Sequence, residues 1–188
     1  LMYTDYKANG YRSGANQIEK WNPITNTNIW YAPIGVTTLY NAFALAIDKD
    51  GTYIYAGGPM SDSDLYKINC SSGAIAKIVD LESNMPINDI AVDTSFIYAG
   101  HGNLAGAISK YNFAGTQIWS YRYGAHQHVF AVAVDKDGYS YDANEVNNSV
   151  VKVSPTGGFV WECVGATAYV TALAISNGLI GSFPSEWQ

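Results

Sequence analysis

The sequence has few charges and no long apolar run, and both absences exclude classes of partner. Lysine and arginine number 10 against 16 aspartates and glutamates, which gives a formal net charge of −6 over 188 residues. The basic residues form no cluster, whereas binding to nucleic acid or to an anionic membrane surface requires concentrated positive charge. No apolar stretch approaches the roughly 18 residues of a membrane-spanning helix. We therefore expect no nucleic-acid partner and no membrane span.

Cysteine is also scarce, and the two that are present, Cys70 and Cys163, fall in different repeats of the chain. A disulfide requires Cα atoms that lie close together, so we expect two free thiols, and the redox compartment stays open. The sequence is instead rich in tyrosine and glycine, with 15 and 18 residues. Such a composition is typical of secreted, cell-surface and virion proteins, which favours an extracellular, envelope or virion location.

An internal repeat is the clearest feature of the chain. A phrase of alanine, an apolar residue and aspartate or serine recurs every 41 to 45 residues, starting at Ala46, Ala91, Ala133 and Ala174. A lysine phrase keeps step with it, at Lys20, Lys67, Lys110 and Lys152. This period is that of a four-stranded propeller blade. The predicted fold class is therefore all-β: a single β-propeller domain over residues 1–188 with about four blades of four strands.

The repeat divides the chain into units of approximately 1–41, 42–88, 89–128 and 129–169, with a partial unit at 170–188. The first strand of a unit is a run of small apolar residues, predicted at 43–48, 90–93, 130–135 and 173–176. The turn that follows carries Asp-Lys-Asp-Gly at 48–51 and again at 135–138. Because aspartate initiates turns and glycine adopts positive φ, these sequences predict tight hairpins.

Near the end of each unit, a turn residue precedes the outer strand by a fixed spacing. Four residues separate the members of each pair: Asn26 and Trp30, Gly73 and Lys77, Gly115 and Trp119, Gly157 and Trp161. The pattern resembles the tryptophan-docking repeat of quinoprotein-like (PQQ-type) propellers, and the Asp-x-Asp-Gly hairpins resemble those of NHL and WD-type propellers. The resemblance implies that each tryptophan packs on the glycine-bearing turn of a neighbouring blade. Lys77 departs from the pattern and implies one weaker joint.

The strand count leaves two interpretations of the ring. Residues 2–6 and 179–183 both fit the pattern of a second strand, so we expect the chain to begin and end within a blade. In the first interpretation, residues 172–176 pair with residues 2–6 and close a ring of four blades. In the second, the blades are part of a larger propeller, or a half-ring whose open edges are covered by a partner chain. Open edges also favour a homo-oligomer.

Candidate site residues gather in the loops of one predicted face, near the central channel. They are three histidines and three acidic residues: His101, His126, His128, Asp62, Asp64 and Glu145. Neutral imidazoles suit zinc and carboxylates suit calcium, so a bound metal or a general base is one interpretation. The other interpretation is that these histidines bind backbone groups or water and have no chemical role.

No catalytic motif can be assigned in the sequence, which favours binding over chemistry. The resemblance implies that PQQ would require a larger ring and a pair of adjacent cysteines, so no cofactor is expected, although calcium or zinc would suit the acidic and histidine side chains. We expect a non-catalytic binding or structural module of an extracellular, envelope or virion assembly. Its tyrosine-rich channel face suits a protein or carbohydrate ligand. The alternative is a small propeller enzyme, a lyase or hydrolase, that uses the histidines and carboxylates.

Overall fold

The structure is a computed structural model, and it describes residues 2–4, 10–14, 17–33, 44–58, 64–80, 85–102, 107–122, 128–144, 148–165 and 167–175. Blade 1 contains β1 (Met2–Thr4), β2 (Gly10–Gly14), β3 (Gln17–Asn22) and β4 (Thr27–Pro33). Blade 2 contains β5 (Ala44–Ile47), β6 (Tyr53–Gly57), β7 (Leu65–Asn69) and β8 (Ile75–Val79). Blade 3 contains β9 (Ile87–Val92), β10 (Phe96–His101), β11 (Ala107–Asn112) and β12 (Gln117–Arg122). Blade 4 contains β13 (Val129–Val134), β14 (Ser140–Asn144), β15 (Ser149–Val153) and β16 (Phe159–Cys163).

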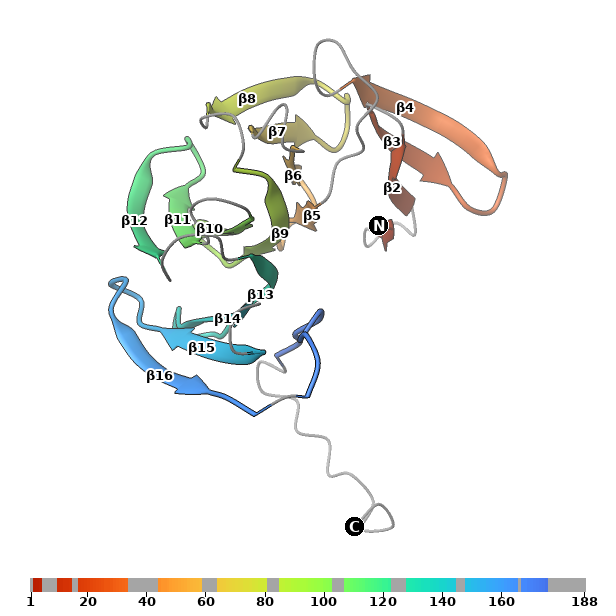
Figure 1. The fold of residues 1–188 in the computed structure, drawn as a ribbon. Helices are drawn as coiled ribbons and strands as arrows, with labels where there is room; N and C mark the ends of the chain where they lie inside the picture. The colour runs from red at the N-terminus through yellow and green to blue at the C-terminus, as the bar shows by residue number, and fades with distance from the viewer. Residues whose placement is uncertain are drawn as a thin grey trace.

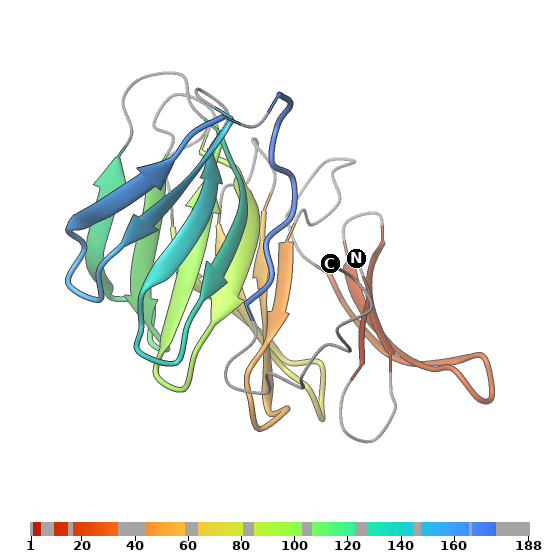
Figure 2. The same cartoon turned by 90° about the horizontal axis from the view of Figure 1, so that it is seen from below.

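The four blades are separate four-stranded sheets in which each strand pairs with the next along the chain. They follow one another along an arc, with the inner strands β5, β9 and β13 side by side (Figures 1 and 2). The all-β fold with four-stranded blades confirms the prediction from the repeat. None of the residues that the structure describes belongs to a helix that is long and apolar enough to cross a membrane.

Of the two interpretations of the ring, the pairing that would close it is not formed among the described residues. Met2–Thr4 pairs with Gly10–Gly14 as the first strand of blade 1, and it was predicted as a second strand. Residues 172–175 form no strand, and the remaining residues of the predicted C-terminal strands, 176 and 179–183, lie outside the described ranges. The segment 10–14, Gly-Tyr-Arg-Ser-Gly, has weak β-propensity, and no strand was predicted there. Pairing with β3 along the whole length of the segment overrides that propensity.

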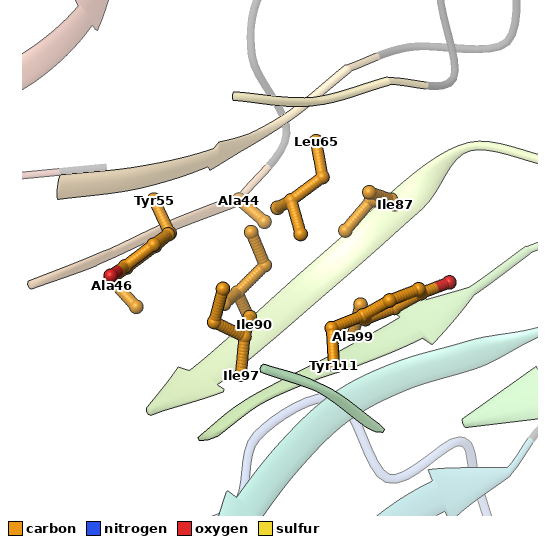
Figure 3. Close-up of a cluster of buried hydrophobic side chains, with 9 residues drawn as sticks. All are labelled: Ala44, Ala46, Tyr55, Leu65, Ile87, Ile90, Ile97, Ala99 and Tyr111. Carbon is orange, nitrogen blue, oxygen red and sulfur yellow. The ribbon is translucent and has the colours of Figure 1, made fainter. Parts of the chain in front are cut away.

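The core lies between blades, where small inner-strand residues let neighbouring sheets approach. Figure 3 shows the cluster between blades 2 and 3, made by Ala44, Ala46, Tyr55, Leu65, Ile87, Ile90, Ile97, Ala99 and Tyr111. The inner strands approach closely at Gly57, because a Cβ there would lie 2.5 Å from Ile87 Cγ2. Burial of this apolar surface between sheets is the main term that holds successive blades together.

The hairpins after the first strands are held by their aspartates. Asp93 Oδ1 accepts hydrogen bonds from the backbone N–H groups of Ser95 and Phe96 at 2.6 and 2.7 Å. Its Oδ2 accepts one from the Tyr98 hydroxyl at 2.8 Å. Asp135 repeats the arrangement with Tyr141 at 3.0 Å. The repeated aspartate therefore caps the turn and satisfies a tyrosine of the second strand. As predicted, the glycines of these turns have positive φ, 66° at position 51 and 80° at position 138.

Buried tyrosines make the fold sensitive to alkali. Burial raises the pKa of Tyr55 and of Tyr98 well above the usual value for tyrosine. The stabilisation from these neutral buried tyrosines is complete below pH 10, which is about the pKa of a tyrosine in the unfolded chain. Above that pH it is lost, because the tyrosines ionise in the unfolded chain and not in the folded protein. We expect an absorbance titration to detect a class of tyrosines that ionises only as the protein unfolds, and Tyr98→Phe to reduce that class by one. Ionisation of all 15 tyrosines in the folded protein near pH 10 would contradict this.

Two joints between blades use a tryptophan of the outer strand. Trp30 packs on the turn at Gly73, where a Cβ would lie 3.0 Å from the indole, and its Nε1 donates to the Cys70 carbonyl at 3.2 Å. Trp119 packs on Gly157 in the same way and donates to the Pro155 carbonyl at 2.9 Å. A lysine of the third strand donates to the same carbonyl in each joint. These bonds are 3.0 Å from Lys20 to Cys70 and 3.4 Å from Lys110 to Pro155.

The joint between blades 2 and 3 has no tryptophan on the outer strand of blade 2. An aromatic ring from the turn of blade 3 takes its place. The spacing places Lys77 at the position of the tryptophan in the other blades. In the structure Ala76 lies opposite Lys67, because the bulge in the β7–β8 pair is shifted along the strand. Phe113, in the turn of blade 3, stacks on Tyr55 of blade 2 with ring centroids 5.6 Å apart. Lys67 Nζ donates to the Phe113 carbonyl at 3.5 Å. The aromatic side chain missing from the outer strand is thus supplied by the next turn.

Candidate functional site

His101 and His128 lie at the same end of blades 3 and 4, where β10 ends and β13 begins. His101 is the last residue of β10, and His128 directly precedes β13. Gly102 follows His101, and a Cβ there would be 2.8 Å from His128 Nδ1 and 2.6 Å from Asn88 Nδ2. Only a residue without a side chain permits this approach. Asn88 in turn donates to the Val129 carbonyl at 3.1 Å, which ties blade 3 to blade 4 at this point.

His101 is a buried structural residue. Its side chain is 2% exposed, and a ring N–H is hydrogen-bonded to the backbone of Met85. Burial, assisted by the positive charge of Arg122, lowers the pKa of His101 to about 4. The imidazole is therefore neutral at pH 7. A group with so low a pKa is a weak general base near neutrality, and its burial keeps substrate away from it.

The buried histidine should make the protein acid-sensitive. Unfolded histidine has a pKa of about 6.5, above the pKa of about 4 in the fold, so between these values the unfolded chain binds more protons. Stability is then complete above pH 6.5 and falls as the pH approaches 4. We expect His101→Gln to reduce the loss of unfolding free energy between pH 7 and pH 4 by up to about 3 kcal/mol, measured by urea denaturation at each pH. An unchanged pH dependence in the variant would contradict this.

Of the predicted carboxylates the structure describes Asp64, which is engaged in the fold, as is Asp89 of blade 3. Asp64 is buried and pairs with Lys77 Nζ at 3.1 Å, and it accepts a hydrogen bond from the Tyr66 hydroxyl at 3.3 Å. Asp89 accepts a bond from the Val132 N–H at 2.7 Å, and burial raises its pKa. Within the described ranges, no three histidine, cysteine, aspartate or glutamate side chains could together hold a metal. Three other candidates, Asp62, His126 and Glu145, lie outside those ranges.

An aromatic stack next to His128 was not predicted as a site. The rings of His128 and Phe130 stack at 5.9 Å with an interplanar angle of 9°, since residues two apart in a strand lie on one face. The Phe130 ring contacts that of Tyr169 at 5.6 Å. Tyr169 is 57% exposed, so the stack leads from the buried histidine region to solvent. The tyrosine-rich loops were the sequence signal for this surface, but which rings meet depends on how the chain after blade 4 returns past β13.

A hollow of about 250 Å³ lies at the hairpins after the first strands, between blades 2, 3 and 4. It is lined by Lys49, Val92, Asp93, Thr94, Val134, Asp135 and Lys136. Its lysines pair with neighbouring aspartates, Lys49 with Asp50 and Lys136 with Asp137. Its aspartates cap the hairpins as described above. The charged groups of the hollow therefore serve the turns themselves.

The chain is similar to known proteins in structure and not in sequence. No protein-family model matches the chain, and no curated protein sequence matches it. Among solved structures, the β-propeller domain of Cps50 (Swd1) from Myceliophteria thermophila superposes with a TM-score of 0.72 at 10% identity, over 94% of this chain and 58% of that one. Kuenenia stuttgartiensis hydrazine synthase superposes with a TM-score of 0.71 at 14% identity, over 87% and 48%. The chain is a β-propeller. It spans about half the length of these propeller structures.

The thiols agree with the sequence-based expectation. Neither cysteine is in a disulfide, and Cys70 is buried between blades whereas Cys163 is exposed on β16. The Cys70 carbonyl accepts the hydrogen bonds of the joint between blades 1 and 2.

Proposed function

We propose that the chain is a non-catalytic propeller module that binds a protein ligand at the stack of His128, Phe130 and Tyr169. The observation that carries the proposal is this run of three contacting rings, which begins at the half-buried His128 and ends at an exposed tyrosine. Rigid aromatic side chains supply large contact areas at low cost in conformational entropy, and they dominate the energetics of protein interfaces. The composition supports a place in an extracellular, envelope or virion assembly.

The neighbouring groups suit binding better than turnover. His101 is neutral and buried, and Asp64 and Asp89 are already bound to partners in the fold. Each group therefore holds the face of the propeller in shape. A rigid platform of this kind loses little entropy when a ligand side chain packs on the exposed ring of Tyr169.

The proposal can be tested by screening the protein against an array of peptides and glycans and then measuring affinity by calorimetry. We expect peptide binding, and we expect Tyr169→Ala and His128→Ala each to weaken it at least about tenfold. Tyr31→Ala, which removes an exposed tyrosine on the outer strand of blade 1, is the matched control and should leave affinity unchanged. Binding of glycans alone, binding that ignores both variants, or a catalytic turnover lost in His128→Ala would overturn the proposal.

A further inference from the structure

Blade 4 presents an inter-blade joint that is assembled on one side only. Trp161 lies opposite Lys152 in the β15–β16 pair, as Trp119 lies opposite Lys110 in blade 3. Lys152 Nζ sits 4.1 Å above the Tyr139 ring, as Lys110 Nζ sits 4.0 Å above that of Phe96. The edge contact of Trp161 with Tyr141 likewise repeats that of Trp119 with Tyr98. The donor half of the joint is therefore already in place.

What differs is the exposure of the tryptophan. Trp161 is 40% exposed, and none of the described glycines packs on it as Gly73 and Gly157 pack on Trp30 and Trp119. Its neighbours Phe159 and Val160 are exposed as well. In blades 1 and 3 the equivalent tryptophan is covered by the turn of the next blade.

Blade 1 carries the missing half, a turn of the accepting type. Asn22 Oδ1 accepts hydrogen bonds from the N–H groups of Ile24 and Thr25 at 2.9 and 3.2 Å. Asn69 organises the turn of blade 2 in the same way. Asn26 has φ of 52°, in the left-handed region that Gly73 and Gly157 occupy in the covered joints. Ile24 is 88% exposed, so this turn is open to solvent.

The two open halves also match in type. The acceptor carbonyl belongs to the residue after the turn-capping side chain, Cys70 after Asn69 and Pro155 after Ser154. By position the equivalent residue in blade 1 is Pro23, which is exposed. The joints are of two kinds. In the first, the facing blade has a tryptophan and the turn has a small residue or proline at this position; in the second, the facing blade has Ala76 and the turn has Phe113. Trp161 and Pro23 match the first kind.

We propose that the turn at residues 22–26 of a second copy of this chain docks on Trp161 and Lys152, with the Pro23 carbonyl accepting from both. The docking continues the interface that already joins blades 1 and 2 and blades 3 and 4. Two copies placed head to tail supply eight four-stranded sheets, which lies within the range of about four to eight blades of known propellers. A head-to-tail contact that closes on itself gives a defined dimer and no filament.

Sedimentation velocity over a range of protein concentrations tests the proposal. We expect a dimer whose dissociation constant rises at least about tenfold in Trp161→Ala and in Pro23→Phe. Ile118→Ala is the matched control, since Ile118 is 50% exposed on the outer strand of blade 3 and away from both halves. It should leave dissociation unchanged. Circular dichroism of each variant establishes that it is folded, and the two single variants test opposite sides of the contact independently.

The double variant Trp161→Ala with Pro23→Phe provides the sharper test. It converts the contact into the second kind of joint, in which a phenylalanine of the turn stacks on a tyrosine of the facing blade, here Tyr141. We expect the double variant to associate more tightly than either single variant. A monomer at every concentration, a dimer indifferent to both single changes, or a double variant whose losses simply add would overturn the proposal.

Discussion

Replacing Gly115 by alanine should destabilise the protein by more than about 3 kcal/mol. The added Cβ would lie 1.9 Å from the backbone carbonyl oxygen of Ile78 in the neighbouring blade, and φ at this position is +87°. A backbone carbonyl cannot move aside as the end of a flexible side chain can, so the joint between blades 2 and 3 must open. The left-handed conformation adds about 1–2 kcal/mol for any residue with a side chain.

Gly138→Ala separates these two costs. Gly138 has nearly the same φ, +80°, but a Cβ there would lie 3.7 Å from its nearest neighbours, which is an ordinary contact. We expect this variant to lose only the conformational cost of about 1–2 kcal/mol. Urea unfolding of both proteins measures the difference. Equal losses in the two variants would mean that the turn at Gly115 does not pack on the β8 backbone.

Trp119→Ala should cost about 3 kcal/mol, at the lower end of the range for removal of a large core side chain. The indole of Trp119 fills the space above Gly157 and donates to the Pro155 carbonyl, so its removal opens the joint between blades 3 and 4. At protein concentrations low enough for a monomer, Trp161→Ala should cost less than about 1 kcal/mol, as exposed sites do.

Chemical denaturation of the two variants compares a covered with an uncovered tryptophan in the same structural position. Trp119→Phe is the intermediate case: it keeps a ring over Gly157 and loses the indole N–H, for about 1 kcal/mol. If dilute Trp161→Ala were destabilised as much as Trp119→Ala, then Trp161 would be covered within the monomer. The stability of a repeat fold is a sum of such interfaces, so each joint should be separately measurable.

The strands that could be predicted from the sequence are those with a strong local signal. In blades 2 to 4, apolar runs ending in aspartate predicted the first hairpin of each blade, and blades 2 and 4 add a turn glycine with positive φ. The first strands predicted at 43–48 and 130–135 lie at Ala44–Ile47 and Val129–Val134 in the structure. These segments have both a hydrophobic pattern and a turn residue, and the two agree.

The strands that were mispredicted depend on pairing. Gly10–Gly14 has little β-propensity and is ordered as a strand by β1 and β3 on either side. Residues 173–175 carry the repeated phrase, yet they form no strand, because a strand needs a hydrogen-bonded neighbour as well as a suitable sequence. The shift that places Ala76 opposite Lys67 follows from a bulge, which spacing alone does not reveal.

In the candidate site, too, the sequence predicted which residues lie on one face but not how they are packed. The sequence placed His101 and His128 on one face of the propeller, and in the structure Gly102, next to His101, packs closely on His128. Whether a histidine is buried depends on what packs over it, so the neutral state of His101 could not be predicted. The ion pair of Asp64 with Lys77 could not be predicted from the sequence either, because it forms across the β7–β8 pair.

Amide hydrogen exchange most directly tests the claim that the turn of each following blade holds the outer strand of the one before it. The comparison is between β12, residues 117–122, which blade 4 covers, and β16, residues 159–163, which no described turn covers. We expect the amides of β16 to exchange faster than those of β12 in dilute protein. Their exchange rates should become alike as the concentration rises and a second copy docks. Equal protection of β12 and β16 at every concentration would contradict it.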